Sequence, residues 1–184
     1  AAISYSWMSE LYSRAPYVSD RDRVQLDAEG SIQYGMYYWD DNYPDSHVFA
    51  EGECLRKTFD PDFMLYHTMA VDEWGHMKGA DSAEYANAVA AVGHLIAARM
   101  PEWLEKGYQV VVTADHGMNN LGIHVGTEQA QREVALYIFS DKVENGRFEE
   151  NYISQLNVAP LVCKLMGVPA TEGMKQELEI VFSK

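Results

Sequence analysis

The sequence predicts an α/β fold of the layered α/β/α type with a mainly parallel sheet, and three observations lead to this class. Short apolar runs at 63–67, 108–113 and 134–139 are typical of buried strands. Helical patterns alternate with these runs, as in folds whose helices cover a parallel sheet. Asp and His residues directly follow two of the runs, at the strand ends where α/β proteins place their sites.

The first third of the chain has a less regular pattern. Residues 1–6 are typical of the end of a strand, and residues 7–14 of a short helix. The stretch 15–45 is rich in aromatic, Pro and Gly residues without clear periodicity, so we interpret it as a loop with short strands and as a candidate cap over a site. The spacing over 47–59 predicts a helix, with Ser46 as its N-cap.

The remainder of the chain contains two more helical patterns. An Ala-rich stretch over 81–105 has apolar residues at helical spacing, and Pro101 is expected to kink or break that helix. A further helix is predicted over 153–166, and it ends at Gly167, a residue type common just after helices. Together these elements predict one globular domain, or a large part of one, over residues 1–184.

Composition excludes some classes of partner. The chain has 28 acidic against 14 basic residues and a formal net charge of −14, so no nucleic-acid-binding surface is expected. No apolar run reaches the roughly 18 residues that a membrane span needs, so no membrane segment is expected in this chain. The composition does not indicate a compartment, and bacterial cytoplasm and periplasm both remain open.

The first group of candidate site residues follows the run at 63–67. Asp72 and His76 lie four residues apart, and we expect a loop there in which Gly75 allows a sharp turn. The pattern Asp-x-x-Gly-His is weak by itself, and a solvated loop is the alternative interpretation. Trp74, in the same segment, is expected either to line a substrate pocket or to pack at its rim.

The second group follows the run at 108–113. Asp115 and His116 are adjacent at the strand end, where burial would require each to be paired. His124 follows in a glycine-rich turn. Carboxylate oxygens and imidazole nitrogens together suit zinc and similar divalent ions, so the two groups predict a metal site if their strands are neighbours.

The ordered set of motifs resembles the alkaline phosphatase superfamily, and within it the type I phosphodiesterase/nucleotide pyrophosphatase family. The motifs are Asp72-x-x-Gly75-His76, then Thr113-Ala114-Asp115-His116-Gly117-Met118, then His124. The segments at 5–12 and 43–47 also resemble bacterial members, and the segment at 157–167 resembles the C-terminal helix of the superfamily. The similarity covers nearly the whole chain and corresponds to the C-terminal portion of an alkaline-phosphatase-like domain.

The resemblance implies a site with two divalent metal ions, zinc being expected and manganese or iron being alternatives. Asp72, His76 and His124 would bind one ion, and Asp115 and His116 would contribute to the other. The family also uses a Thr or Ser nucleophile, which is expected upstream of residue 1, so the 184 residues alone are expected to be inactive. His124-Val125-Gly126 departs from the His-Gly-Gly of many relatives.

The implied activity is metal-dependent hydrolysis of phosphodiester or pyrophosphate bonds in a small-molecule phosphate ester. Phosphonate hydrolase, phosphomonoesterase and phosphomutase activities of the same superfamily are alternatives. From another class, a non-catalytic metal-binding or interaction module is also compatible with the motifs. A sheet that lacks its first strands would expose an edge, so a homo-oligomer or association with an N-terminal segment is expected.

Overall fold

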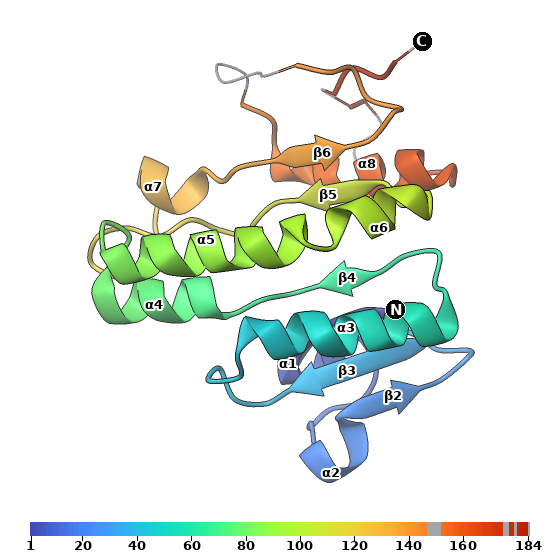
Figure 1. Cartoon of the computed structure of the whole chain (residues 1–184), viewed down its shortest axis with the longest axis horizontal. Helices are drawn as coiled ribbons and strands as arrows, with labels where there is room; N and C mark the ends of the chain where they lie inside the picture. Colours follow the sequence, from blue (N-terminus) through green and yellow to red (C-terminus); the bar gives the residue numbers. More distant parts are fainter. Residues whose placement is uncertain (147–151, 175–176, 179, 184) are drawn as a thin grey trace. The chain divides into compact units, whose positions relative to one another are not determined.

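The computed structural model describes residues 1–146, 152–174, 177–178 and 180–183 (Figure 1). These residues form two compact units. The first unit contains residues 1–98 and 116–132, and the second contains residues 99–115 and 133–184. Whether all 184 residues belong to one domain remains a prediction.

A four-stranded, mainly parallel sheet organises the first unit, and it confirms the predicted fold class. The strands have the order β2-β3-β1-β4. Strand β1 pairs in parallel with both of its neighbours, and β2 is antiparallel to β3 at the edge. Their bounds are Ala2–Tyr5 for β1, Val24–Leu26 for β2, Tyr34–Tyr38 for β3 and Leu65–Tyr66 for β4.

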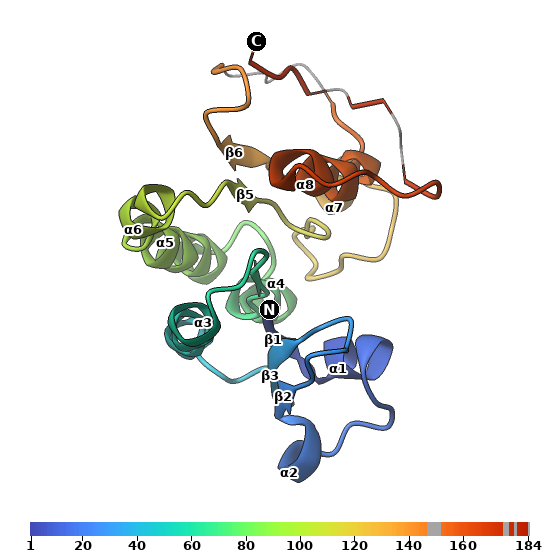
Figure 2. The ribbon, with the colours of Figure 1, turned by 90° about the vertical axis from the view of Figure 1, so that its right-hand side faces the viewer.

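Helices lie on both sides of this sheet. Figure 2 shows α3 and α1 on opposite faces, and both helices contact β1 and β3. Helix α4 packs along α5. The bounds are Ser6–Tyr12 for α1, Ser19–Asp22 for α2, Asp45–Phe59 for α3, Ala70–Lys78 for α4, Ala83–Ala97 for α5 and Gln129–Arg132 for α7.

The core of the first unit lies between the sheet and α3. Ile3 and Tyr5 of β1 and Tyr38 of β3 pack against Val48 and Leu55 of α3, and all five are buried. Burying side chains of this size stabilises the fold by about 1.5–3 kcal/mol each. This packing fixes the strand ends from which the candidate site is built.

Strand β3 lies inside the segment 15–45, which we interpreted as a loop with short strands and as a candidate cap. It is an internal strand of the sheet, because it pairs in parallel with β1 over residues 35–38 and antiparallel with β2 on its other side. Its residues Tyr37 and Tyr38 are buried, so these aromatic side chains pack against the sheet in the interior of the unit. A covering role for the rest of the segment remains a prediction.

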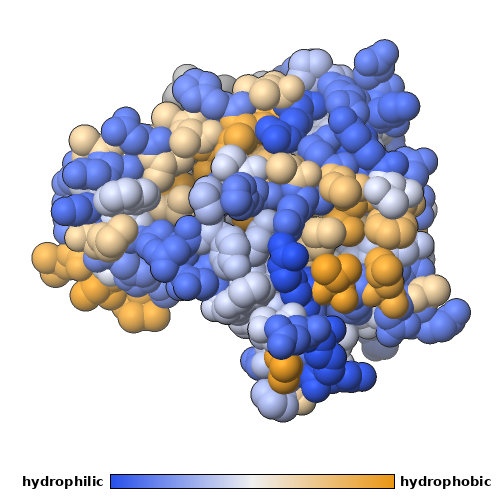
Figure 3. Space-filling view, turned by 60° about the horizontal axis from the view of Figure 1, so that its bottom comes forward, coloured by the Kyte–Doolittle hydropathy of each residue, from blue (hydrophilic) through white to orange (hydrophobic). Residues whose placement is uncertain are grey.

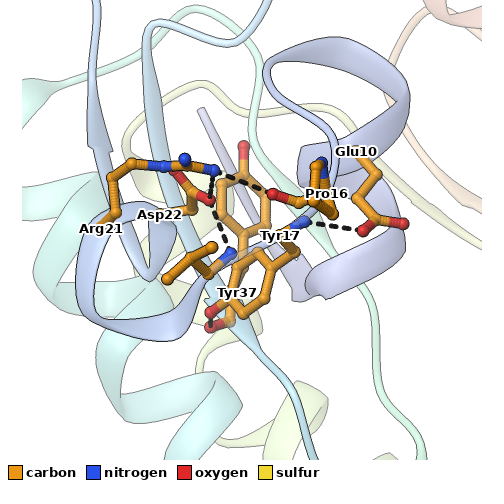
Figure 4. Close-up of polar contacts among 7 residues, drawn as sticks. Glu10, Pro16, Tyr17, Arg21, Asp22 and Tyr37 are labelled. Carbon is orange, nitrogen blue, oxygen red and sulfur yellow. Dashed lines mark hydrogen bonds and ion pairs between the residues drawn. The ribbon is translucent and has the colours of Figure 1, made fainter.

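A network of polar contacts holds the α2 turn beside β3 (Figure 4). The Arg21 guanidinium donates to both carboxylate oxygens of Asp22, at 2.6 Å each. The Asp22 carboxylate also accepts the Val18 N–H at 2.8 Å. These donors lower the pKa of Asp22 to about 2, and the hydrogen bonds from Arg21 make the largest contribution. The Tyr17 hydroxyl donates to the Tyr37 carbonyl at 2.9 Å, which attaches this turn to the sheet.

Helix α4 replaces the loop that we expected around Asp72. Asp45, at the start of α3, accepts hydrogen bonds at Oδ1 from the Met69 and Ala70 N–H groups, at 3.1 and 3.4 Å. These are N–H groups at the N-terminal end of α4, which have no intrahelical partner. Gly75 is buried inside the helix, where a Cβ would lie 2.8 Å from Met118 Cε. Gly75 therefore permits close packing and makes no turn.

The Asp45 contact has an expected pH dependence. Burial raises the pKa of Asp45, against the lowering effect of its two N–H donors and His67. A carboxyl whose folded-state pKa is raised contributes stability below its unfolded pKa of about 3.9, and this is lost as the pH rises through the folded pKa. We expect the stability of Asp45→Asn relative to the wild type to increase from about pH 4 to about pH 7. Urea unfolding of both proteins measures this difference, and a difference that does not change with pH would contradict it.

The second unit contains an antiparallel strand pair and two principal helices. Helix α6, Met100–Glu105, carries Pro101 in its first turn, so the proline separates it from α5 as predicted. The strands are β5, Val110–Val112, and β6, Tyr137–Phe139. A 3₁₀ turn at Gln155–Asn157 leads into α8, Val158–Met166. Leu161 and Leu165 of α8 pack with Val111, Ile138 and Ile180 to form this unit's core.

Hydrophilic side chains cover much of the surface seen in Figure 3, and hydrophobic side chains gather there in separate clusters. Among the described residues, no helix has the length and apolar character that a membrane span requires.

Candidate metal centre

Helix α4 presents two of the predicted ligands on one face. Asp72 and His76 lie four residues apart, which places them one above the other on a helix. His76 Nε2 lies 3.4 Å from Asp72 Oδ2. The predicted pair therefore comes together through helix geometry and not through a glycine turn.

His116 and His124 lie beside the other carboxylate oxygen of Asp72. His116 Nε2 is 3.9 Å and His124 Nε2 is 4.0 Å from Asp72 Oδ1. The two imidazole rings stack with their centroids 3.9 Å apart. Asp72, His116 and His124 each offer one ligand atom within 4.8 Å of the other two.

Buried polar side chains hold the loop that carries these histidines. Asn119 Oδ1 accepts the N–H groups of Leu121 and Ile123, at 3.0 Å each. Gln131 Nε2 donates to the Ile123 carbonyl at 3.0 Å. Asn119 and Gln131 are only 8% and 5% exposed, so the loop is fixed before His124 by groups that solvent does not compete for.

Backbone carbonyls orient two of the imidazoles for binding through Nε2. His76 Nδ1 lies 2.7 Å from the Gly122 carbonyl, and His116 Nδ1 lies 3.0 Å from the Gly117 carbonyl. A carbonyl only accepts, so each Nδ1 carries the proton in these contacts. The unprotonated Nε2 atoms, which lie toward Asp72, are then available as metal ligands.

The residues present fit a divalent metal ion. Asp72 Oδ1 is buried and has no hydrogen-bond partner within the part of the chain that the structure describes. Tetrahedral zinc with ligands at about 2.0–2.2 Å places two ligand atoms roughly 3.4 Å apart. The separations of 3.9 and 4.0 Å from Oδ1 to the histidine nitrogens are longer than this by about half an ångström, a distance that a small adjustment of the side chains around an ion would close. An ion held there would satisfy the buried oxygen.

The structure brings together four of the five predicted ligands. Asp115 falls in the other compact unit, where its carbonyl and that of Ala114 accept hydrogen bonds from Gln155 Nε2, at 2.9 and 3.0 Å. Its role with His116 at a second ion therefore remains a prediction. The structure also groups His116 with Asp72 and His124, whereas the family resemblance assigns His116 to the second ion.

A cavity of about 470 Å³ adjoins this group, and most of its wall was not predicted. Asp72 and His76 form part of the wall, with Trp39, Asp40, Asp41, Asn42, Met69, Glu73 and Met77. Residues 39–42 directly follow β3 at its carboxyl end. The signal in the sequence was a Trp-Asp-Asp-Asn run after a strand, but the position of β3 among the short strands expected over 15–45 was not predicted.

The chain belongs to the type I phosphodiesterase / nucleotide pyrophosphatase family, whose model matches residues 5–159. This finding confirms the resemblance that the motifs carry. No solved structure matches the chain significantly.

Similar proteins are named as ethanolamine phosphate transferases. The chain is 27% identical over 157 residues to the catalytic subunit of GPI ethanolamine phosphate transferase 3 from Mus musculus. This similarity covers 81% of the chain and 14% of that protein. It is 29% identical over 115 residues to the Homo sapiens protein of the same name, covering 61% and 10%. GPI ethanolamine phosphate transferase 2 from Schizosaccharomyces pombe is 24% identical over 132 residues, covering 61% and 17%. The chain thus spans a sixth or less of the length of the mouse and human relatives.

These relatives contradict the expected class of partner. A small-molecule phosphate ester was expected as the substrate, but the names of the relatives specify GPI, a glycolipid, as what they act on. The expectation was wrong because the metal-ligand motifs indicate only that a phosphate ester reacts, and not what the phosphate is attached to. The residues that recognise the rest of a substrate carry no comparable motif.

Proposed function

We propose that this chain contributes a divalent-metal centre for cleavage of a phosphodiester bond, with transfer of ethanolamine phosphate to a hydroxyl group of a glycolipid acceptor. The observation that supports this most directly is the grouping of Asp72, His116 and His124 around one point. Family membership supports phosphodiester chemistry, and the names of the relatives support transfer. Hydrolysis is the same reaction with water as the acceptor.

In this proposal each ligand side chain has a defined role. A divalent ion, when bound, supplies positive charge for the non-bridging phosphate oxygens and the reacting oxygens. Asp72 Oδ1, His116 Nε2 and His124 Nε2 hold that ion. The Gly117 carbonyl keeps the His116 ring in the required tautomer, and the Gly122 carbonyl does so for His76. A two-ion arrangement completed by Asp115 remains part of the proposal.

The proposal is tested on the full-length protein, loaded with zinc or manganese, with the 4-nitrophenyl ester of ethanolamine phosphate, because the 184 residues by themselves are expected to be inactive. Release of nitrophenol would measure cleavage, and mass spectrometry would show whether a glycolipid acceptor or water receives ethanolamine phosphate. We expect turnover that EDTA abolishes and added metal restores. A protein that binds metal but never cleaves the ester would favour the non-catalytic metal-binding alternative.

A further inference from the structure

The cavity beside the metal centre has an unusual lining. Its wall contains the three carboxylates of Asp40, Asp41 and Glu73, and none of the described Lys or Arg residues lines it. Asp72 and His76 belong to the same wall. A phosphate group held at these ligands would therefore have its substituent inside a cavity of strongly negative character.

The charges of this wall are largely unneutralised. The side-chain carboxylates of Asp41 and Glu73 form no hydrogen bond or ion pair with another residue that the structure describes. Among the residues that the structure describes, the Asp40 carboxylate accepts hydrogen bonds only from its neighbour Asn42, from N at 3.0 Å and from Nδ2 at 2.6 Å. Carboxylates that converge on one cavity repel each other, and a bound cation would remove that cost.

A buried carboxylate oxygen in the neighbouring cavity also lacks a partner from the described part of the chain. Asp45 is 6% exposed, and while its Oδ1 holds the start of α4, its Oδ2 has no hydrogen-bond partner among the described residues. Asp45 lines a second cavity of about 790 Å³, which shares Asn42 and Glu73 with the first. An unpartnered oxygen in such a position favours a positively charged neighbour.

The negative charges of these carboxylates also act on the buried hydroxyl group of Tyr5, whose pKa is raised. Burial is the main cause of its raised pKa, and the charges of Asp45, Asp41, Glu73 and Asp40 raise the pKa further. The four carboxylates thus act on one region behind the cavity wall. Their negative potentials add there instead of being dispersed over the surface.

We propose that this cavity, the acidic cavity, binds the ammonium group of an aminoethyl phosphate substrate whose phosphate would be held by the divalent ion at Asp72, His116 and His124. Trp39, 48% exposed, offers a ring for a cation–π contact, and Tyr43 supports that ring edge-on at 5.5 Å between centroids. Met69 and Met77 complete an apolar part of the wall. An indole ring and two thioethers suit an organic ammonium better than a hard metal ion, which selects oxygen ligands.

This inference rests on the proposed function, and it is tested by binding so that it does not depend on turnover. Ethanolamine phosphate and propyl phosphate differ only in an ammonium against a methyl group. Calorimetric titration of the zinc-loaded protein is expected to give about tenfold tighter binding of ethanolamine phosphate, since a charge-assisted contact is made only by the ammonium. Glu73→Gln and Asp41→Asn should each reduce this ratio to about twofold or less.

The matched control is Glu29→Gln, which removes a charge from an exposed turn outside the cavity and should keep the full preference. Zinc content and thermal unfolding measure whether each variant is folded and loaded with zinc. If Glu73→Gln does not fold or does not bind zinc, the binding preference of Asp41→Asn tests the proposal. Equal affinities for the two phosphates in the wild type would overturn the proposal. So would an additional Ca²⁺ or Mn²⁺ ion that competes with ethanolamine phosphate and is lost in Glu73→Gln. A retained preference without any ester cleavage would instead refute the proposed reaction and leave the ammonium site standing.

Discussion

Asp72→Ala is expected to lower the zinc affinity of the protein on the order of 100-fold or more. Loss of a partner that only orients a ligand already costs about 10–100-fold, and Asp72 is the residue that all three neighbouring histidines face. The substitution also removes the buried Oδ1 around which the nitrogen atoms lie. Element-resolved mass spectrometry and competition with a chromophoric chelator measure the loss.

Asp20→Ala is the matched control, because it removes an exposed carboxylate from α2 and should leave zinc affinity unchanged. Wild-type zinc affinity in Asp72→Ala would contradict the assignment. Two histidine variants test whether His116 and His124 bind the same ion or different ions. Loss of the same ion in His116→Ala and His124→Ala would agree with the grouping in the structure, and loss of different ions would favour the division that the family resemblance implies.

Gly122→Ala is expected to destabilise the fold by roughly 2 kcal/mol and to weaken zinc binding about tenfold. Gly122 has φ +72°, where a side chain is strained, and its Cβ would lie 2.6 Å from the His76 carbonyl oxygen and 2.9 Å from that of Gly75. Its own carbonyl accepts the His76 Nδ1 proton at 2.7 Å. The loop would have to move away from α4, and the orientation of His76 would be lost.

Gly167→Ala is the control that distinguishes the effect of backbone strain from the effect of the close contact between Gly122 and α4. Gly167 has φ +73° but nothing within 4 Å of a Cβ, so its substitution is expected to cost only about 1 kcal/mol and to leave zinc affinity unchanged. Urea unfolding and chelator competition measure both quantities. Similar losses of zinc affinity in the two variants would show that the approach of Gly122 to α4 does not matter for the site.

The parts of the fold that the sequence predicts are those with local signals. The apolar runs identify β1, β4, β5 and β6, and Pro101 marks the break between α5 and α6. Strand β3 has the sequence Tyr-Gly-Met-Tyr-Tyr, in which apolar residues face both sides of the sheet and no alternation is left. Its position became visible only through its pairing with β1.

The ligands could be predicted individually, but their grouping could not. Helix α4 depends on Asp45, which lies 24 residues before Met69, and on the close packing of Gly75 against Met118. Both are tertiary interactions that override a local pattern suggesting a turn. The acidic cavity was missed for the same reason, because residues 39–42 join Asp72 and Glu73 only through the fold.

The placement of Asp72 and His76 on one helix limits how this site can change in evolution. Each residue added or removed between them would turn one ligand by about 100° around the helix axis, away from the other. Substitutions between the two positions leave their spacing intact, whereas a change of length by a single residue breaks the pair. Members of the family that use this helix are therefore expected to keep three residues between the carboxylate and the imidazole, even where the rest of the helix has diverged.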